Sequence, residues 1–348
     1  MEAILKKESL GQWIATLQER ADVYAPDFVE DAWAFTKVNP TATVELDHSN
    51  TVRPAKGFVF PQREILYRFR IESGKAPELT DTGPEVEPTV VFGVRPCDGR
   101  AMVRNDRVFT CGPSDPYYEA RRDKVVFVGL ACNAPPSPNC FCVSVGGSPH
   151  SEDGLDVLMT DLGQNYYVKA ISDQGKEILS RASGLFHAPK PSDQKDLRSA
   201  HAIALEHPQR AISTMETVAE ALKRNFDSPV WDKLAQACIG CGACTYLCPS
   251  CHCFDINDEV TGKSPLTGAR VRTWDNCQFP DFTMHSSGHN PREDTGARLR
   301  QRICHKLLYF VENHKMQQCT GCGRCITHCP VGIDIVKIAN VMEEGVWQ

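Results

Sequence analysis

Seventeen cysteines stand out in this chain of 348 residues, and their spacing indicates what chemistry they perform. The pattern C-x2-C-x2-C-x3-C-P begins at Cys238 and occurs again from Cys319. Three thiolates at such intervals wrap one face of a cubane iron–sulfur cluster, and the fourth cysteine of such a run ligates the other cluster of the pair. The spacing therefore predicts two [4Fe–4S] clusters.

The ligands of the two clusters are expected to cross between the runs. The first cluster is assigned to Cys238, Cys241, Cys244 and Cys329, and the second to Cys319, Cys322, Cys325 and Cys248. Glycines between the cysteines let the backbone bend tightly and direct amide N–H groups at the cluster sulfurs. A structural zinc ion takes separated ligand pairs in a tetrahedron, so two such crowded runs favour iron over zinc.

An insertion at about residues 254–318 separates the two runs, where compact ferredoxins have only a short connection. Four further thiols lie in it or directly before it: Cys251, Cys253, Cys277 and Cys304. They are either ligands of a fourth cluster or buried thiols packed beneath the clusters, because free cysteine is also a common small hydrophobe. The insertion also carries Arg298, Arg300 and Arg302, which indicate either a solvated helix or a patch that neutralises thiolate charge or docks a partner.

The N-terminal part carries a second, looser group of cysteines. Cys97 and Cys132 each follow a predicted buried strand, and Cys140 and Cys142 lie on a Pro/Gly-rich loop. Carboxyl ends of neighbouring strands are where α/β sheets bind cofactors, so these four thiols can meet at one sheet edge. Their spacing matches no fixed consensus, which leaves open a third cluster or ordinary buried thiols. Cys111 has no close partner and is expected not to be a ligand.

The hydrophobic pattern predicts a mixed α/β domain followed by a mostly helical, ferredoxin-like dicluster domain. We expect helices over residues 3–21, 61–70, 192–212 and 215–226, the second beginning at Pro61, and strands over 88–94, 123–130, 154–162 and 165–171. The boundary is placed near residue 228, which gives domains 1–228 and 229–348. Without a low-complexity linker, the two parts are expected to pack together.

Composition limits the setting of this chain. A net charge of −6 argues against nucleic acid as the main partner. The N-terminus shows no signal peptide and no apolar run could span a bilayer, so we expect a cytoplasmic chain that reaches a membrane only through a partner. Many thiols in a chain without a secretion signal are expected to be metal ligands rather than disulfides.

The order of the motifs resembles one family. "RPCDGRAM", "ACNAPPSPNCFC", "CIGCGACTYLCPSCHCF", "RTWDNCQF", "GHNPRE" and "CTGCGRCITHCP" are similar to the 4Fe–4S dicluster family of electron-transfer subunits. That family includes the iron–sulfur electron-transfer subunit of anaerobic sulfite reductase, the beta subunit of sulfhydrogenase-type NiFe hydrogenases, and iron–sulfur subunits beside flavin oxidoreductases that feed heterodisulfide reductases. The resemblance covers residues 53–330 and implies that Cys97, Cys132, Cys140 and Cys142 bind a third [4Fe–4S] cluster.

The resemblance implies an electron wire, which means a subunit that transfers electrons and does not itself catalyse a reaction. The chain would relay single electrons between a catalytic subunit of the hydrogenase, heterodisulfide reductase or sulfite reductase type and an FAD/NAD(P)-binding flavoprotein subunit. The chain itself shows no G-x-G-x-x-G after a strand, so neither NAD nor FAD is expected in it. The alternatives are a self-contained reductase with an open cluster site in the insertion, served by His285 or His289, and an iron–sulfur sensor.

Overall fold

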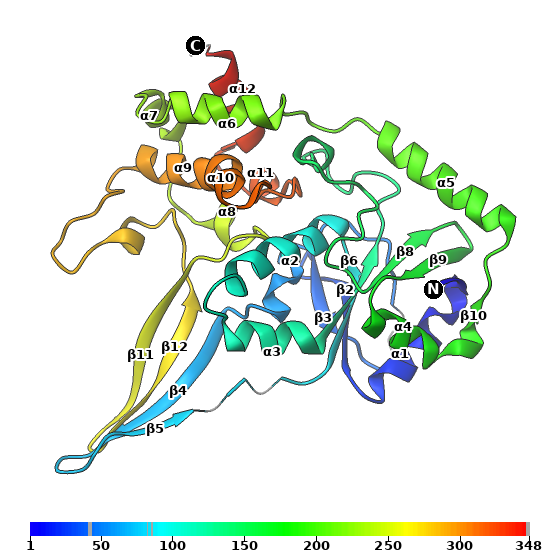
Figure 1. The fold of residues 1–348 in the computed structure, drawn as a ribbon, viewed down its shortest axis with the longest axis horizontal. Helices are drawn as coiled ribbons and strands as arrows, with labels where there is room; N and C mark the ends of the chain where they lie inside the picture. Colours follow the sequence, from blue (N-terminus) through cyan, green and yellow to red (C-terminus); the bar gives the residue numbers. More distant parts are fainter. Residues whose placement is uncertain (41–43, 82, 85, 346–348) are drawn as a thin grey trace.

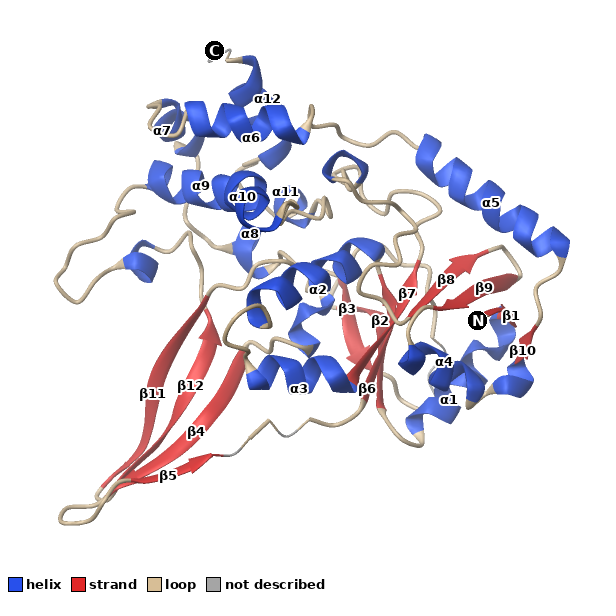
Figure 2. Ribbon diagram, in the orientation of Figure 1, coloured by secondary structure: helices blue, strands red, loops and turns tan. Residues whose placement is uncertain are grey.

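The computed structural model describes residues 1–40, 44–81, 83–84 and 86–345. Figure 1 shows a large sheet with helices packed around it, a long arm of strands that projects from the sheet, and a group of helices that carries the C-terminus. Figure 2 separates these parts by secondary structure. In the described part of the chain, no helix has the length and apolar character needed to cross a membrane.

The large sheet is mixed, with a parallel centre and antiparallel edges. Its order is β10–β1–β9–β8–β7–β6–β2–β3. The strands β2, β6, β7 and β8 pair in parallel, and the outer strands pair antiparallel. The bounds are β1 (Glu2–Lys6), β2 (Asp22–Val29), β3 (Ala32–Lys37), β6 (Thr89–Val94), β7 (Val125–Leu130), β8 (Val157–Asp161), β9 (Asn165–Ala170) and β10 (Phe186–His187). All four predicted strands are present.

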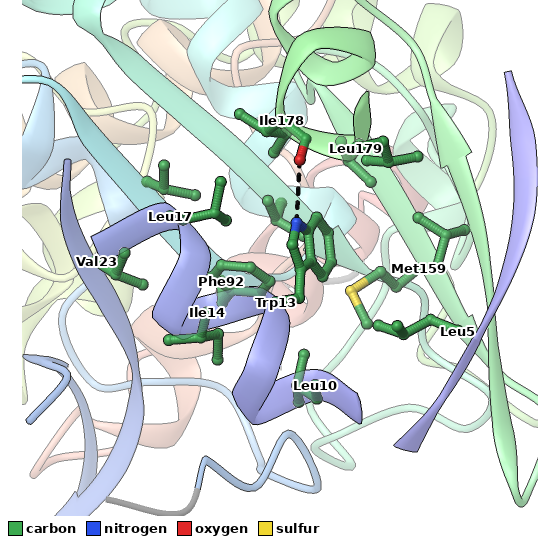
Figure 3. Close-up of a cluster of buried hydrophobic side chains, with 14 of the residues drawn as sticks. Leu5, Leu10, Trp13, Ile14, Leu17, Val23, Phe92, Met159, Ile178 and Leu179 are labelled. Atoms are coloured by element: carbon green, nitrogen blue, oxygen red, sulfur yellow. Dashed lines mark hydrogen bonds between the residues drawn. The ribbon is translucent and has the colours of Figure 1, made fainter. Parts of the chain in front are cut away.

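Helices cover both faces of this sheet, because alternate residues of its central strands point to opposite sides. One face packs α1 (Leu10–Gln18) and α4 (Asp173–Ser180), and the other packs α2 (Pro96–Phe109) and α3 (Pro116–Lys124). Figure 3 shows the first of these cores, in which the fully buried Trp13 of α1 donates a hydrogen bond from Nε1 to the carbonyl oxygen of Ile178 at 3.2 Å. A sheet packed by helices on both faces therefore supports the loops at its edges.

One helix prediction is partly wrong and another is wholly wrong. Residues 3–21 begin with a strand, β1, because the apolar run Ala3–Leu5 pairs with β9 and β10 before α1 starts. Residues 61–70 form β4 (Arg63–Ile71) rather than a helix beginning at Pro61. The strand pairs along its length with β12, and this non-local pairing overrides the local proline signal. The helix predicted over 192–212 is present as α5 (Pro191–Glu206), which ends six residues earlier than expected, and that over 215–226 is present as α6 (Met215–Arg224).

The projecting arm is an antiparallel sheet in the order β11–β12–β4–β5. It joins β4 and β5 (Glu78–Asp81) of the N-terminal half to β11 (Phe254–Lys263) and β12 (Leu266–Trp274) of the insertion. Because the insertion contributes this hairpin, the expectation of a mostly helical C-terminal part is not confirmed. The mixed α/β class of the chain is confirmed.

The C-terminal elements are α7 (Val230–Ala235), α8 (Ala243–Tyr246), α9 (Thr295–Cys304), the π-helical turn η6 (His305–Tyr309), α10 (Phe310–His314), α11 (Arg324–Thr327) and α12 (Ile335–Glu344). Of these, α7, α9, η6, α11 and α12 pack with α6 in one apolar core. Short 3-10 turns lie at η1 (Lys7–Ser9), η2 (Ala55–Phe58), η3 (Val143–Val145), η4 (Ser183–Leu185) and η5 (Pro280–Thr283). The same core includes Phe141 and Val145 from the loop after β7, so the N-terminal cysteine loop packs directly on the C-terminal helices.

Candidate metal centre

The first cysteine run lies in a loop that leads into the short helix α8. Gly242, with φ of 76°, turns the chain into this helix, which carries Cys244. A cavity, here called cavity A, is lined by cysteines of both runs. The thiols expected to hold the first cluster all line it: Cys238, Cys241, Cys244 and Cys329. The fourth cysteine of the second run thus lies with the first three of the first run.

The second run repeats this local structure. Gly323, with φ of 74°, precedes α11, which carries Cys325. A second cavity, cavity B, is lined by the thiols expected to hold the second cluster: Cys248, Cys319, Cys322 and Cys325. Each run therefore contributes its fourth cysteine to the cavity of the other run. The walls of cavities A and B each include the four thiols of one expected ligand set, and thiolate sulfur is the donor type that a cubane cluster takes.

The N-terminal thiols meet at the carboxyl edge of the large sheet. Cys97 lies at the start of α2, directly after β6, and Cys132 follows β7. The loop after β7 brings Cys140 and Cys142 to them, and these four thiols line a further cavity, cavity C. The wall of cavity C thus includes the four thiols expected for a third cluster, as the walls of cavities A and B include the other two expected sets.

The cysteine-lined cavities follow one another through shared residues. Cys325 lines both cavity A and cavity B, and Cys322 lines both cavity B and cavity C. The backbone N–H of Phe141 donates to the carbonyl oxygen of Gly321 at 2.9 Å, which fixes the N-terminal loop against the second run. Cavity B therefore lies between the other two in a continuous row.

Burial raises the pKa of several thiols in this row, whereas a hydrogen bond from Cys251 and the charge of Lys306 lower the pKa of Cys248. Burial raises the pKa of Cys140 to about 12 and that of Cys319 to about 11, and it also raises the pKa of Cys142. A buried thiolate without a counter-charge is costly, and a metal ion that binds such thiols displaces their protons.

Of the four further thiols, three are neighbours of one another and the fourth belongs to the apolar core of the C-terminal helices. Cys251, Cys253 and Cys277 lie together beside the ligand runs, where a hydrogen bond from Cys253 lowers the pKa of Cys277 to about 5. The Thr245 hydroxyl also lies 3.5 Å from the Cys277 sulfur. Cys304 instead packs in the apolar core of the C-terminal helices, and burial raises its pKa to about 12.

Other predicted residues lie away from the row. Cys111 is exposed after the end of α2. His285 and His289 are exposed on the loop between β12 and α9, with ring centroids 5.3 Å apart. Among the described residues, no three His, Cys, Asp or Glu side chains converge closely enough to hold a single metal ion.

The arginines of α9 divide between three environments. Arg298 is buried and donates to the backbone carbonyls of Arg292 and Glu293. Arg300 is partly exposed and pairs with Asp227 at 3.5 Å. Arg302 is buried and lines both cavity A and cavity B.

Sequence reasoning missed two buried lysines near the cysteine runs. Lys56, in η2, donates from Nζ to the carbonyl oxygen of Cys251 at 2.9 Å and lies over the ring of Trp274. Lys306 lines cavity B, and although burial opposes its charge, Cys248 and Cys251 outweigh this and raise its pKa. Each lysine stands alone among apolar residues, in "AKGFVF" and "CHKLLYF", and that is the signal that could have revealed them.

An ion pair ties the N-terminal half to the second run. The guanidinium of Arg324 in α11 donates two hydrogen bonds to the carboxylate of Asp98 in α2, at 2.5 and 2.8 Å. Its Nε also donates to the carbonyl oxygen of Thr51 at 2.7 Å. Because Asp98 adjoins Cys97 and Arg324 adjoins Cys325, this pair fixes cavity C relative to cavity B.

Comparisons with known proteins bear on these sites. A family model described as a 4Fe–4S dicluster domain matches residues 237–333, a range that spans both cysteine runs. Sulfhydrogenase 2 subunit beta of Pyrococcus furiosus is 30% identical to the chain over 345 residues, which cover 98% of each protein. No solved structure was found to match the chain.

Proposed function

The chain belongs to the 4Fe–4S dicluster family of iron–sulfur electron-transfer subunits, and on this premise we propose that it is the wire of a cytoplasmic oxidoreductase complex. The resemblance predicted from the cysteine motifs is confirmed by both comparisons. The dicluster domain means that the chain holds two [4Fe–4S] clusters. In the proposal, single electrons pass between a catalytic subunit of the complex and an FAD/NAD(P)-binding flavoprotein subunit. The named relative favours the hydrogenase type over the heterodisulfide reductase and sulfite reductase types.

The ligand assignment of the proposal follows the donor sets of the cavities. We assign the first cluster to cavity A and the second to cavity B, each with the four thiols expected for it, and a third [4Fe–4S] cluster to Cys97, Cys132, Cys140 and Cys142 in cavity C. A [4Fe–4S] cluster accepts and releases one electron at a time. We do not extend the proposal to a fourth cluster, because Cys304 packs in the apolar core of the C-terminal helices.

The observation that supports the wire most directly is the sharing of Cys322 and Cys325 between neighbouring cavities. Both ends of this row approach the surface. Beside cavity A, Cys241 is exposed and Ile239 is 66% exposed, and next to Cys142 of cavity C, Val143 is 45% exposed. Cavity B is enclosed between them, with three fully or nearly fully buried residues in its wall: Phe141, Lys306 and Thr320. We propose that partner subunits exchange electrons at the two ends.

The proposal keeps the division of the chain near residue 228. The mixed α/β part, residues 1–228, would carry cavity C, and residues 229–348 would carry cavities A and B. The helix α6, directly before this division, packs on α12, so the two parts are proposed to act as one body. Electron transfer would therefore not require a domain movement.

Iron analysis of the full chain, purified without oxygen, tests the assignment. Three clusters require about twelve irons per chain and two require about eight. Cys140→Ser is expected to reduce the iron content by about four, while the matched control Cys111→Ser leaves it unchanged because that thiol is exposed and away from the row. An unchanged iron content in Cys140→Ser would remove the cluster of cavity C from the proposal.

Stopped-flow reduction tests the role as a wire. NAD(P)H is expected to bleach the visible absorbance of the chain only when a flavoprotein subunit is present. Cys140→Ser is expected to slow the transfer across the row while cavities A and B keep their iron. If the isolated chain consumed NAD(P)H or evolved hydrogen unaided, the wire proposal would fail.

A further inference from the structure

Two buried cations lie on one continuous helix beside the cysteine runs. Arg302 of α9 and Lys306 of η6 are four residues apart and only 6% and 2% exposed. In the described part of the chain, neither forms a salt bridge with a carboxylate. Lys306 lies in a π-helical turn, a feature that is frequent at functional sites.

Burying two cations side by side costs free energy when no counter-charge is present. Like charges four residues apart on a helix repel each other, and burial adds the cost of removing each cation from water. Buried charges in proteins are therefore paired or face a metal centre. The groups that face these two cations are the thiols of the ligand runs, so the missing anion is the thiolate shell of the clusters.

The contacts of Arg302 place it between the two dicluster cavities. Its side chain lines cavity A together with Cys244 and lines cavity B together with Cys248. Its Nη1 also lies 3.7 Å from the sulfur of Cys251, close enough to donate a weak hydrogen bond. One guanidinium thus faces both ligand sets.

The contacts of Lys306 restrict it to cavity B. Its Nζ donates to the hydroxyl of Ser250 at 3.1 Å, and that hydroxyl lies 3.5 Å from the sulfur of Cys248. Lys306 lines cavity B but is not among the residues that line cavity A. The two cations therefore differ in which ligand set they approach.

We propose that Arg302 and Lys306 are positioning residues that set the reduction potentials of the two clusters of the dicluster domain, Arg302 acting on both and Lys306 on the cluster in cavity B alone. The inference rests on the proposed ligand assignment. A cluster becomes more negative when it is reduced, so a fixed nearby cation stabilises the reduced form more than the oxidised form. Each cation therefore raises the reduction potential of the cluster that it faces. Because Arg302 faces both clusters, its charge raises both reduction potentials.

Potentiometric titration of the full chain, followed by electron paramagnetic resonance, tests this inference. Arg302→Met is expected to move two potentials to more negative values, and Lys306→Met only one. A tenfold change in the ratio of oxidised to reduced cluster at a fixed potential corresponds to about 59 mV for one electron, and we expect at least this change. Arg300→Met is the matched control, because Arg300 lies on the same helix but pairs with Asp227 outside the cavities.

Charge-keeping variants separate charge from packing. Lys306→Arg and Arg302→Lys are expected to retain potentials close to those of the wild-type chain. Potentials that stay unchanged in both methionine variants at full iron content would overturn the inference, as would equal shifts in the charge-keeping and the neutral variants. A wild-type chain with fewer than about eight irons would instead contradict the cluster assignment itself, so the two failures are distinguishable.

Discussion

Replacing Gly321 with alanine tests how the N-terminal cysteine loop depends on the second run. Gly321 has φ of 70°, and a Cβ atom there would lie 2.5 Å from both the Cα and the N atom of Cys142. Gly240 occupies the same place in the first run with φ of 66°, but a Cβ atom there would meet only the carbonyl oxygen of Gln278 at 3.5 Å. The two positions share the backbone conformation and differ in what they touch.

The magnitude follows from this difference. A left-handed conformation costs alanine about 1–2 kcal/mol at either position. Overpacking adds about 1–3 kcal/mol at Gly321 alone, because backbone atoms of Cys142 must move. If that displacement opposes cluster binding in cavity C, the binding constant falls about 5- to 150-fold, since 1.4 kcal/mol corresponds to a factor of ten.

Iron per chain, measured after purification without oxygen and limited iron supply, is the assay. Gly240→Ala is expected to keep about twelve irons, and Gly321→Ala to fall toward about eight, with the paramagnetic signals of the other clusters intact. If Gly321→Ala retained as much iron as Gly240→Ala, the close packing would have no bearing on cavity C and the reasoning would be refuted. Equal losses in both variants would show that backbone strain, and not the contact with Cys142, governs cluster binding.

The remaining predictions concern single side chains. Asp98→Asn should lower the free energy of unfolding by about 3–5 kcal/mol, because it leaves the buried charge of Arg324 unpaired; anaerobic denaturant titrations measure this. The double variant with Arg324→Met should recover part of this loss. Strictly additive losses of the two substitutions would contradict the pairing. Burial, and then the charge of the stacked His150, lower the pKa of His201 to about 4, so the folded state holds it neutral while the unfolded chain takes up a proton below about pH 6.5. The contribution of His201 to the free energy of unfolding should therefore be complete above pH 6.5 and decline toward pH 4. His201→Gln should reduce this decline in unfolding titrations. An identical pH profile in the variant would contradict the role given to His201. Cys304→Ala should leave the iron content unchanged, since the thiol packs in an apolar core, and loss of about four irons would assign it to a cluster after all.

The sequence was sufficient to predict those strands whose signal lies within their own residues. The strands β6 and β7 were predicted because their continuous apolar residues are buried on both sides, which is a property of the run alone. The strand β4 was missed because its partner, β12, comes from the distant insertion. Neither Pro61 nor the residues after it carry information about that pairing.

The sequence by itself determined the two ligand runs, because ligands three residues apart reach the same cluster through local backbone geometry. Only the tertiary structure decided how these sites connect. It brought Cys322 to the wall of cavity C, buried Lys306 and Arg302 against the thiols, and placed Cys304 in the apolar core of the C-terminal helices. Such contacts join residues far apart in the chain and depend on how sheet and helices pack, so spacing in the sequence cannot specify them.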